Sequence, residues 1–399
     1  MRERLARVTL MRLAEPGDPV MGRLTASCGP EAAVEQVRRG ALDAGFVHWF
    51  GSARHRGAAG SGDGDGAGAG DRLARILAAW AARLETADPA EDLAAGERTG
   101  ARLVVPGDAE WPTQLDDLGD VRPHALWLHG EANLRFACIR SVAVVGSRAA
   151  TPYGAHVAAE FGAGLSERGY GVVSGGAYGV DGAAHRGALA GGAPTVAVLA
   201  CGTDVTYPSA HHDLFAAVRG QGVLVSECPM GVRPTRPRFL VRNRLIAALA
   251  RGTVVVEAAV RSGALNTAGH ATALRRVLAA VPGPVTSDTS AGCHRLIRQG
   301  AATCVTTPAE MTELVGVIGD ELAPEPRGPV LPRDRLDPET RRVLEAVPAR
   351  AGAGPATIAV AAGTDLETVL SCLGGLAAAG YVERTSRGWR LRPERPEGG

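Results

Sequence analysis

The sequence predicts an α/β protein with a doubly wound parallel sheet. Between Ser141 and Gly283, six short apolar segments alternate with stretches of helical patterning. Strands made of continuous apolar runs are typical of parallel sheets that helices cover on both faces. The regular alternation of these strands with helices indicates an extended Rossmann-type arrangement. Further helical patterns precede and follow this region, so we expect more than one domain.

Residues 1–90 are predicted to form a small helical region. The segment from Leu5 to Gly45 has helical patterning that prolines interrupt, and a further helix is expected over 71–85. Gly, Ala, Ser and Asp dominate the stretch 51–71. Such a stretch has too few apolar groups to offset the entropy cost of ordering it, so we expect a flexible insertion there.

Residues 91–319 are predicted to form the Rossmann-type domain. Leu103 to His129 contains two short strand-like runs, LVV and ALWL, between turn signals. The strands expected after them are VAVVG from 142, GVVSG from 171, TVAVLA from 195, GVLVSE from 222, TVVVEA from 253 and VLAAVPG from 277. The helices expected between them cover residues 153–168, 181–190, 212–219, 240–250 and 265–276.

Residues 320–338 have the composition of a linker, and 339–399 are predicted to form a winged-helix domain. Two helices are expected over 339–347 and 356–362, and a third from a capping box at Thr364 and Glu367 to Gly380. A hairpin pattern follows, and three helices before a hairpin are the order of a winged helix. The third helix carries acidic residues and no arginine, so it matches a DNA major groove poorly. We expect it to contact protein or, weakly, duplex DNA.

The composition excludes several classes of protein. All 43 basic residues are arginine, so mechanisms that need a lysine, such as the Walker A phosphate site, are excluded. The seven cysteines form no C-x-x-C pair, which favours reduced thiols. No segment approaches the roughly 18 apolar residues that a membrane span needs. We therefore expect a cytoplasmic protein with no membrane contact.

The loop after the first of the six strands, Gly146-Ser147-Arg148, offers a tight turn, a hydroxyl and a guanidinium. It lies at the carboxyl edge of the predicted parallel sheet, where such folds bind ligands. A guanidinium at that edge can hold a phosphate through paired hydrogen bonds. The alternative interpretation is a turn with a solvated arginine.

The loop after the second strand, SGGAYGVDGAAH, passes from a strand through glycines into a helix. Gly175, Gly176 and Gly179 can adopt positive φ and leave backbone N–H groups bare, and the helix start adds partial positive charge. Ser174 and the first two glycines are expected to converge on the same edge as Arg148. The sequence therefore predicts an anion-binding loop.

Three titratable side chains near these loops could catalyse a reaction, but we favour structural roles for them. Asp181 and His185 lie at a helix start, where we expect them to cap the helix and brace the glycine loop. Glu257 ends a strand, but no second carboxylate or histidine lies near it in the sequence to complete a catalytic pair. The histidines lack the spacing of a metal site, so neither a metal nor a cofactor is predicted.

A run of arginines without acidic neighbours separates Cys228 from Val256. Its members are Arg233, Arg236, Arg238, Arg242, Arg244 and Arg251, with Phe239 among them. Guanidinium groups bind phosphates and an aromatic ring stacks on bases, so this pattern favours single-stranded nucleic acid. A solvated charged face is the alternative.

Seven motifs follow one another along the central region. They are GSRAATPYG from 146, SGGAYGVDGAAHRGAL from 174, AVLACGTDVTYP from 197, LVSECP from 224, FLVRNRLIAALA from 239, VVVEA from 254 and AVPGP from 280. In order and spacing these motifs resemble the DNA-processing protein A (DprA/Smf) family over about residues 101–317. The predicted C-terminal winged helix agrees with this resemblance.

The resemblance implies a non-enzymatic protein that binds single-stranded DNA, forms a homodimer and helps load the RecA recombinase in natural transformation or recombination. It implies that Arg148 holds a phosphate and that a backbone cradle is formed by Ser174, Gly175, Gly176 and Ala177. The DNA path would include Arg236, Arg238, Phe239, Arg242 and Asn243. The predicted DNA-binding set is completed by Gly146, Ser147 and Arg244.

Some motifs depart from the family pattern. The usual FPxRNR reads FLVRNR from Phe239, the usual GSLxTA reads GALNTA from Gly263, and Cys293 stands where asparagine is usual. No arginine is lost by these changes, so DNA binding should be retained. Because of these departures, the exact dimer surface and the affinity for the partner protein do not follow from the resemblance.

Two other functions are compatible with parts of the sequence. A nucleotide sensor or an enzyme similar to the cytokinin-activating phosphoribohydrolases would also use a glycine loop, but the PGGxGT motif of those enzymes is missing, since the corresponding region reads EAAVRSG from Glu257. A transcription factor could use the winged helix, although the acidic third helix argues against it.

Overall fold

The structure is a computed structural model that describes residues 1–53, 66–317, 319, 321–324 and 332–393. It divides into two compact units, Met1–Ala323 and Pro324–Gly399. The first unit holds an N-terminal group of helices and a nine-stranded sheet. The second holds the helices α15 to α17 and a two-stranded hairpin.

The sheet of the first unit is mixed, although most of it is parallel. Its strands lie in the order β1-β2-β6-β5-β4-β3-β7-β8-β9. They are β1 (Arg102–Val104), β2 (Leu126–His129), β3 (Ser141–Val145), β4 (Gly171–Ser174), β5 (Thr195–Leu199), β6 (Val223–Ser226), β7 (Gly252–Val255), β8 (Val277–Ala280) and β9 (Thr303–Cys304). The six predicted strands, β3 to β8, pair in parallel as predicted, and β9, which was not predicted, pairs in parallel with β8, whereas β1 and β2 pair antiparallel. The prediction of a wholly parallel sheet is therefore wrong at this edge.

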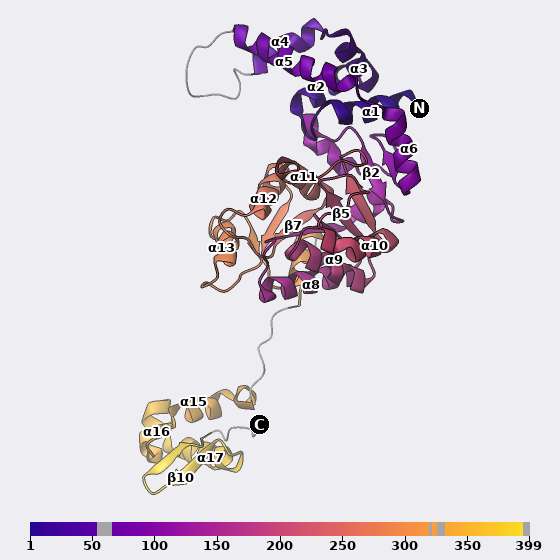
Figure 1. Ribbon diagram of the computed structural model, residues 1–399. Coiled ribbons are helices and arrows are strands. Elements are labelled where there is room, and N and C mark those ends of the chain that lie inside the picture. The colour runs from indigo at the N-terminus through magenta and orange to yellow at the C-terminus, as the bar shows by residue number, and fades with distance from the viewer. Residues whose placement is uncertain (54–65, 318, 320, 325–331, 394–399) are drawn as a thin grey trace. The chain divides into compact units, whose positions relative to one another are not determined.

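Helices cover both faces of the sheet (Figure 1). They are α7 (Leu134–Ile139), α8 (Pro152–Glu167), α9 (Val180–Gly191), α10 (His212–Gln221), α11 (Arg236–Leu249), α12 (Gly263–Ala273), α13 (Ala291–Arg298) and α14 (Pro308–Val315). Successive side chains of a strand point to opposite faces. Accordingly Val142 and Val144 pack with α8 and α9, whereas Ala143 and Val145 pack with α11 and α12. This two-sided burial explains why the strands are continuous apolar runs.

The helices predicted between the strands are all present, and the largest difference is at α11. This helix begins at Arg236, four residues before the predicted start. Thr235 is its N-cap and Pro237 lies in its first turn, where the missing proline N–H needs no partner. The earlier start places both Arg236 and Phe239 on the helix.

The N-terminal region is helical, as predicted. Its helices are α1 (Arg2–Leu13), α2 (Pro19–Cys28), α3 (Pro30–Arg39), α4 (Ala44–Ala53), α5 (Gly66–Leu84) and α6 (Pro89–Thr99). Leu10, Leu24, Val37 and Trp80 form the centre of their shared core. The flexible insertion predicted over 51–71 is wrong at both ends, because α4 continues to Ala53 and α5 begins at Gly66. Residues 54–65 lie outside the described part of the chain.

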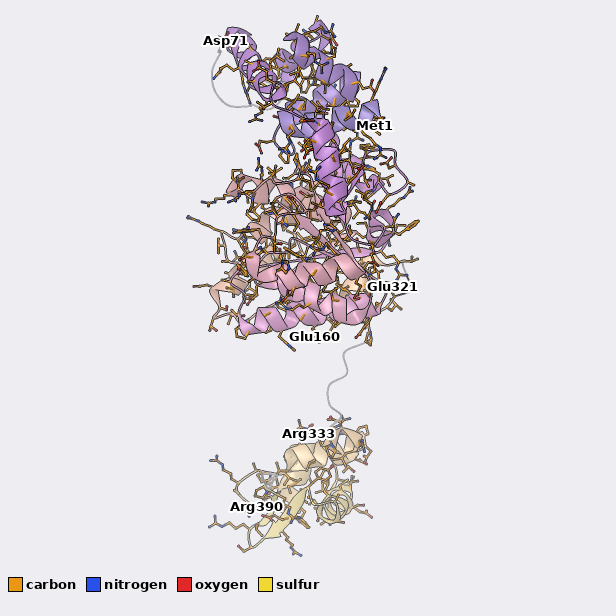
Figure 2. The ribbon with its side chains drawn as sticks, turned by 45° about the vertical axis from the view of Figure 1, so that its right-hand side comes forward. Met1, Asp71, Glu160, Glu321, Arg333 and Arg390 are labelled. Carbon is orange, nitrogen blue, oxygen red and sulfur yellow. The ribbon has the colours of Figure 1, made fainter. Side chains whose placement is uncertain are left out.

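The second unit contains α15 (Pro338–Ala346), α16 (Pro355–Ala362), α17 (Leu366–Ala378) and a hairpin of β10 (Val382–Thr385) and β11 (Gly388–Leu391). The predicted capping box is wrong, because Asp365 is the N-cap of α17 and its carboxylate accepts a hydrogen bond from the Thr368 amide at 2.9 Å. On the hairpin, Arg390, which Figure 2 labels, donates a hydrogen bond to the Glu383 carboxylate at 2.7 Å. The predicted linker 320–338 includes the described 3-10 turn Pro332–Arg335 and the start of α15, while 320 and 325–331 lie outside the described residues.

Among the helices that the structure describes, none is by itself both long and apolar enough to cross a membrane. Only α16 and α17 taken together pass such a test, and they are bent by 105° relative to each other.

Glycines allow α8 and α9 to pack closely. A Cβ atom on Gly162 would overlap the carbonyl oxygen of Ala184, and one on Gly187 would overlap that of Ala159. By contrast, the position of a Cβ on Gly220 in α10 is open space. The two helices therefore approach each other through their backbones, which sets the position of both loops that precede them.

We expect Gly162→Ala to lower the free energy of unfolding of the first unit by about 1–3 kcal/mol, because the added methyl forces the helices apart. Gly220→Ala is the matched control and should leave stability unchanged or raise it by up to about 1 kcal/mol, because alanine favours helix over glycine. Urea unfolding midpoints measure both effects. Equal effects of the two substitutions would contradict the close packing.

Candidate nucleic-acid interface

A cavity of about 710 Å³ lies at the carboxyl edge of the sheet. Strands β4, β5 and β6 are added to one side of β3, and β7 and β8 to the other, so the order of the strands in the sheet reverses between β3 and β7. In open α/β sheets such a switch point forms the crevice that binds ligands. Loops after β3, β4, β5 and β7 line the cavity together with α11 and α12.

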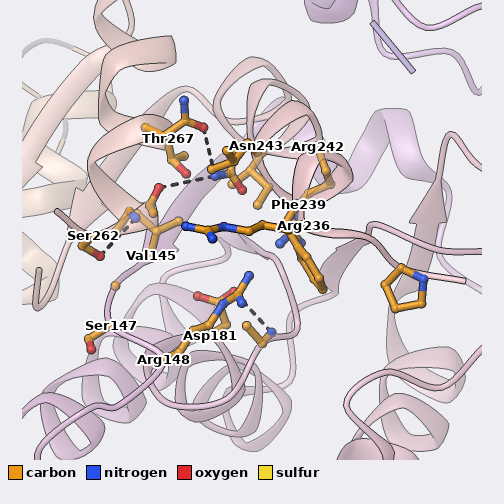
Figure 3. Close-up of a pocket in the computed structure, with 18 of the residues that line it drawn as sticks. Val145, Ser147, Arg148, Asp181, Arg236, Phe239, Arg242, Asn243, Ser262 and Thr267 are labelled. Atoms are coloured by element: carbon orange, nitrogen blue, oxygen red, sulfur yellow. Dashed lines mark hydrogen bonds between the residues drawn. The ribbon is translucent and has the colours of Figure 1, made fainter. Parts of the chain in front are cut away.

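The cavity brings together eight of the thirteen residues predicted to bind DNA. These are Gly146, Ser147, Arg148, Ala177, Arg236, Phe239, Arg242 and Asn243. The other five, which do not line it, are Ser174, Gly175, Gly176, Arg238 and Arg244. In Figure 3, Arg148 and Asp181 lie on one side of the cavity and Asn243 and Thr267 on the other.

The ring of Phe239 is in contact with two guanidinium groups. The Cζ atom of Arg148 lies 4.5 Å from the ring centroid and that of Arg242 lies 5.8 Å from it. The ring of Tyr207 approaches Phe239 with a centroid separation of 5.5 Å. Arginine over an aromatic face is attracted to the electrons of the ring. The arrangement fixes Phe239 and Arg148, which come from α11 and the loop after β3, in one cluster.

Arg242 is a buried side chain that links neighbouring elements through hydrogen bonds, and it is not exposed to solvent as a phosphate ligand would be. Its guanidinium donates hydrogen bonds to the carbonyl oxygens of Gly175, at 2.7 Å, and Val198. Burial lowers the pKa of Arg242 to about 10, and the nearby Asp181 carboxylate opposes this shift. The side chain remains charged at neutral pH and ties α11 to the ends of β4 and β5.

The glycine loop is braced from inside by Asp181. Its Oδ2 atom accepts hydrogen bonds from the amides of Gly175, at 3.2 Å, and Ala177, at 3.3 Å. The expectation of a bare amide is therefore wrong at Gly175, while the expected bracing by Asp181 is confirmed. Burial raises the pKa of Asp181, and Arg242 is the strongest influence in the opposite direction. Ser174 is also buried, and its hydroxyl donates to the carbonyl of Val144 at 2.7 Å.

His185 has a different role from the one predicted. Its Nδ1 atom lies 2.8 Å from the hydroxyl of Thr195 on β5, and that hydroxyl donates to the carbonyl of Val172 on β4. The imidazole is fully buried, and burial together with the nearby His211 lowers the pKa of His185 to about 3. His185 thus braces two strands rather than the glycine loop.

The local sequence predicts that the arginine run has no acidic partners, but two of its members form ion pairs with carboxylates from elsewhere in the chain. Arg238 makes a two-point ion pair with Glu15, with nitrogen–oxygen distances of 2.9 and 3.1 Å. Arg244 is buried, pairs with Glu227 at 2.6 Å and donates to the carbonyl of Val121. Arg244 does not line the cavity, and its buried contacts with Glu227 and Val121 do not support its predicted role in the DNA path, which stays a prediction.

Other arginines remain available at the mouth of the cavity. Arg148, Arg236 and Arg261 are exposed and line it. In the described part of the chain, no carboxylate lies within ion-pair distance of these three guanidinium groups. Arg261 was not predicted, although its position after β7, at the carboxyl edge, was a usable signal.

The wall formed by α12 is neutral and polar, and sequence reasoning missed it. Ser262 caps this helix by accepting a hydrogen bond from the Ala264 amide at 3.3 Å. The side-chain amide of Asn243 donates to Asn266 at 3.1 Å and to the carbonyl of Gly263 at 3.3 Å. This network holds the middle of α11 against the start of α12.

Glu257 is occupied by structural hydrogen bonds. Its carboxylate accepts from the amide of Thr151 at 2.9 Å, from the Thr151 hydroxyl at 2.6 Å and from the Thr289 hydroxyl at 3.1 Å. Thr151 is the N-cap of α8, so this buried carboxylate fixes the start of that helix. Across the described residues, His, Cys, Asp and Glu side chains form no group of three that could hold a metal ion.

Comparison with known proteins gives the family. Residues 102–316, which hold the whole sheet and the cavity, match the family described as DNA recombination-mediator protein A. The chain belongs to this family. Its members match well beyond the sheet: the putative DNA processing protein DprA of Mycobacterium tuberculosis is 44% identical over 393 residues, which cover 96% of this chain and 92% of that protein.

Two further members of the DNA recombination-mediator protein A family show how far the likeness extends. Protein Smf of Escherichia coli is 42% identical over 212 residues, or 53% of this chain and 56% of that protein. The X-ray structure of DNA processing protein A from Streptococcus pneumoniae superposes with a TM-score of 0.56 at 30% identity, covering 71% of this chain and 98% of that one. The mixed, mostly parallel sheet is therefore a feature shared with a solved family member.

The buried imidazole of His185 predicts a pH dependence of stability in this family member. Because its folded pKa is about 3 and an unfolded histidine has a pKa of about 6.5, the unfolded chain binds the extra proton between these values. Stability is therefore full above about pH 6.5 and is lost as the pH falls toward 3. We expect His185→Gln to reduce the slope of unfolding free energy against pH by up to about one proton. Urea unfolding from about pH 4 to 7 measures it, with His156→Gln on α8 as the control, and an unchanged slope for His185→Gln would contradict the assignment.

Proposed function

We propose that the chain binds single-stranded DNA in the cavity at the β3–β7 switch point. The observation that carries this proposal is the contact of Arg148 with Phe239 beside arginines that no described carboxylate neutralises. Single-stranded nucleic acid offers both a phosphate for a guanidinium and an unstacked base for an aromatic ring. The resemblance of the whole chain to proteins named for DNA processing supports the same class of ligand.

The geometry of the cluster favours a single strand over a duplex. Phe239 is only partly exposed and lies in a cavity rather than on a flat surface. A base inside a duplex cannot reach such a ring without leaving its stack, which costs a few kcal/mol. A single strand has no such cost, so its bases can enter while Arg148 and Arg236 bind the adjoining phosphates.

The glycine loop contributes to binding by placing Ala177 at the cavity, and not by offering the amides of Gly175 and Ala177 to a phosphate. Asp181 already occupies the amides of Gly175 and Ala177, so an incoming phosphate is expected to meet side chains first. Ala177 and the Gly146-Ser147 turn line the cavity and can approach the backbone of the strand. Gly175 and Gly176 support this surface from beneath.

We also propose that the protein acts without catalysis. Asp181, which lines the cavity, and Glu257, which follows β7, each accept at least two hydrogen bonds from the protein. They are committed to holding loops and helix starts, so neither is placed to move a substrate proton. Binding the phosphates and bases of a DNA strand needs no group that transfers a proton.

The proposed setting is the cytoplasm, during DNA uptake and transformation or in recombination. There the protein would bind the single strand as a homodimer and help load the RecA recombinase onto it. Residues 339–399 would act as a winged helix that contacts protein or, weakly, duplex DNA. The order of α15, α16, α17 and the hairpin supports that assignment, as does the absence of basic side chains from α17.

Arg148→Ala tests the proposed function. We expect it to weaken binding of a labelled single-stranded oligonucleotide by about tenfold or more, because a charge-assisted hydrogen bond to phosphate is lost. The slope of log K against log salt should also fall by about 0.7, the contribution of one phosphate in a single strand. Fluorescence anisotropy across a salt series measures both quantities.

The control for Arg148→Ala is Arg168→Ala. This exposed arginine follows the end of α8, at the opposite edge of the sheet from the cavity. It should change neither the affinity nor the salt slope. If Arg148→Ala binds single strands as the wild type does, the proposed binding site is wrong.

The Arg238–Glu15 pair gives a second prediction. Glu15→Gln removes the carboxylate that neutralises Arg238, so the freed guanidinium can contact a phosphate of a bound strand. We expect a few-fold increase in single-strand affinity and a salt slope steeper by about 0.7. Glu91→Gln, which breaks the Arg98 pair on α6, should leave both unchanged. Equal behaviour of the two variants would show that Arg238 lies outside the DNA path.

A further inference from the structure

Two tyrosines near the cavity expose about half of their surface to solvent. Tyr178 is 48% exposed and Tyr207 is 45% exposed, whereas the ring of Tyr170 in the same unit is buried. In the described part of the chain, neither exposed tyrosine has a hydrogen-bond partner for its hydroxyl. Their rings therefore have faces that the protein itself does not use.

The topology places both rings on one side of the cavity. Tyr178 follows β4 and Tyr207 follows β5, and these strands are neighbours in the sheet. Because parallel strands end at the same edge, the two loops lie beside the loop after β3 that carries Arg148. Along the edge, the Tyr178 loop lies between the Arg148 loop and the Tyr207 loop, and of the two tyrosines Tyr207 lines the cavity.

Ring contacts hold both tyrosines in position. Tyr207 contacts Phe239 in the cavity at 5.5 Å between ring centroids. Tyr178 packs at 5.2 Å against the edge of His211, which follows Tyr207 by four residues. His211 is itself buried, and its Nδ1 atom lies 3.0 Å from the carbonyl oxygen of Gly176. Phe239, Tyr207 and Tyr178 are thus linked through one short, anchored segment.

We propose that Tyr178 and Tyr207 form a base-stacking platform beside the cavity, across which a bound single strand leaves Phe239 past Tyr207 and then Tyr178. The inference rests on the proposed function and adds the direction of the strand and a second stacking site. Aromatic rings stack on every base, so a row of rings from Phe239 outward suits successive nucleotides of any sequence.

Among the described residues, the loop after β7 on the opposite side of the cavity carries no aromatic side chain, and the hydroxyl of Tyr153, which is 38% exposed, already donates to the Pro282 carbonyl after β8 at 2.7 Å. The loop after β7 exposes Val260 and Arg261, of which Val260 is 52% exposed. An aliphatic side chain has no π-face, and the arginine can bind a phosphate there but adds no aromatic surface. The aromatic side of the cavity therefore gains more from each additional nucleotide.

Binding measured against oligonucleotide length tests this inference. Oligothymidylates from about 4 to about 16 nucleotides, the range of sites in single-strand grooves, are titrated with the full chain at fixed salt. For the longer oligonucleotides we expect Tyr178→Ala to weaken binding by about 5- to 100-fold, as for the loss of one stacked base. The shortest oligonucleotides fill only the cavity and should bind Tyr178→Ala as they bind the wild type.

Three further results separate stacking from other causes. Tyr178→Phe keeps the ring and should retain wild-type affinity at every length. Val260→Ala, on the opposite side, should also match the wild type. The salt slope of Tyr178→Ala should equal that of the wild type, because the substitution removes no charge.

Failure of this inference differs from failure of the proposed function. If the wild type binds single strands and Tyr178→Ala binds every length equally well, or loses affinity equally at every length, the platform is wrong and the cavity assignment stands. If the wild type binds no single strand, or if Arg148→Ala has no effect, the cavity assignment fails and the platform fails with it.

Discussion

The candidate interface depends on the buried guanidinium of Arg242. It joins three elements, because it starts on α11 and donates to carbonyl groups at the ends of β4 and β5. Burying a charge is costly unless hydrogen bonds and an opposite charge compensate for it, and here two carbonyls and Asp181 do so. A Cβ atom on residue 175 would overlap this guanidinium, so a larger residue there would have to displace it from its carbonyl partners. Phe239 lies three residues earlier on α11 and is positioned by the same contact.

This arrangement changes the role of the glycine loop. A strand followed by glycines and a helix is typical of a backbone phosphate site. In this chain the amides of Gly175 and Ala177 are satisfied by Asp181, and the loop's carbonyl at Gly175 receives Arg242. The loop is therefore a scaffold that fixes α11, and the exposed side chains of Arg148, Arg236 and Arg261 line the cavity. The wall on α12 completes the cavity with neutral polar side chains and adds no negative charge to it.

Much of the fold could be predicted from sequence because its signals are local. The apolar runs of β3 to β8 reflect burial on both faces, and the helices between them were found with small errors in their bounds. The antiparallel pairing of β1 and β2 could not be inferred, since LVV and ALWL carry no information about their partners. The same limit applies to charge: Arg238 and Arg244 lie in an acid-free run, yet Glu15 and Glu227 reach them through the fold. Arg148, Arg236 and Phe239 could be found because residue type and position at the sheet edge point to the same chemistry.

The central claim is that a cavity at the sheet's switch point selects a single strand through a guanidinium–aromatic cluster. Competition at physiological salt tests it most directly. The intact protein is loaded with a labelled single-stranded oligonucleotide, and unlabelled single strand or duplex of the same sequence is added. The account predicts that the single strand displaces the label at a far lower concentration than the duplex does. Displacement by the duplex at an equal concentration would contradict it, because a duplex offers the phosphates but hides the bases from Phe239.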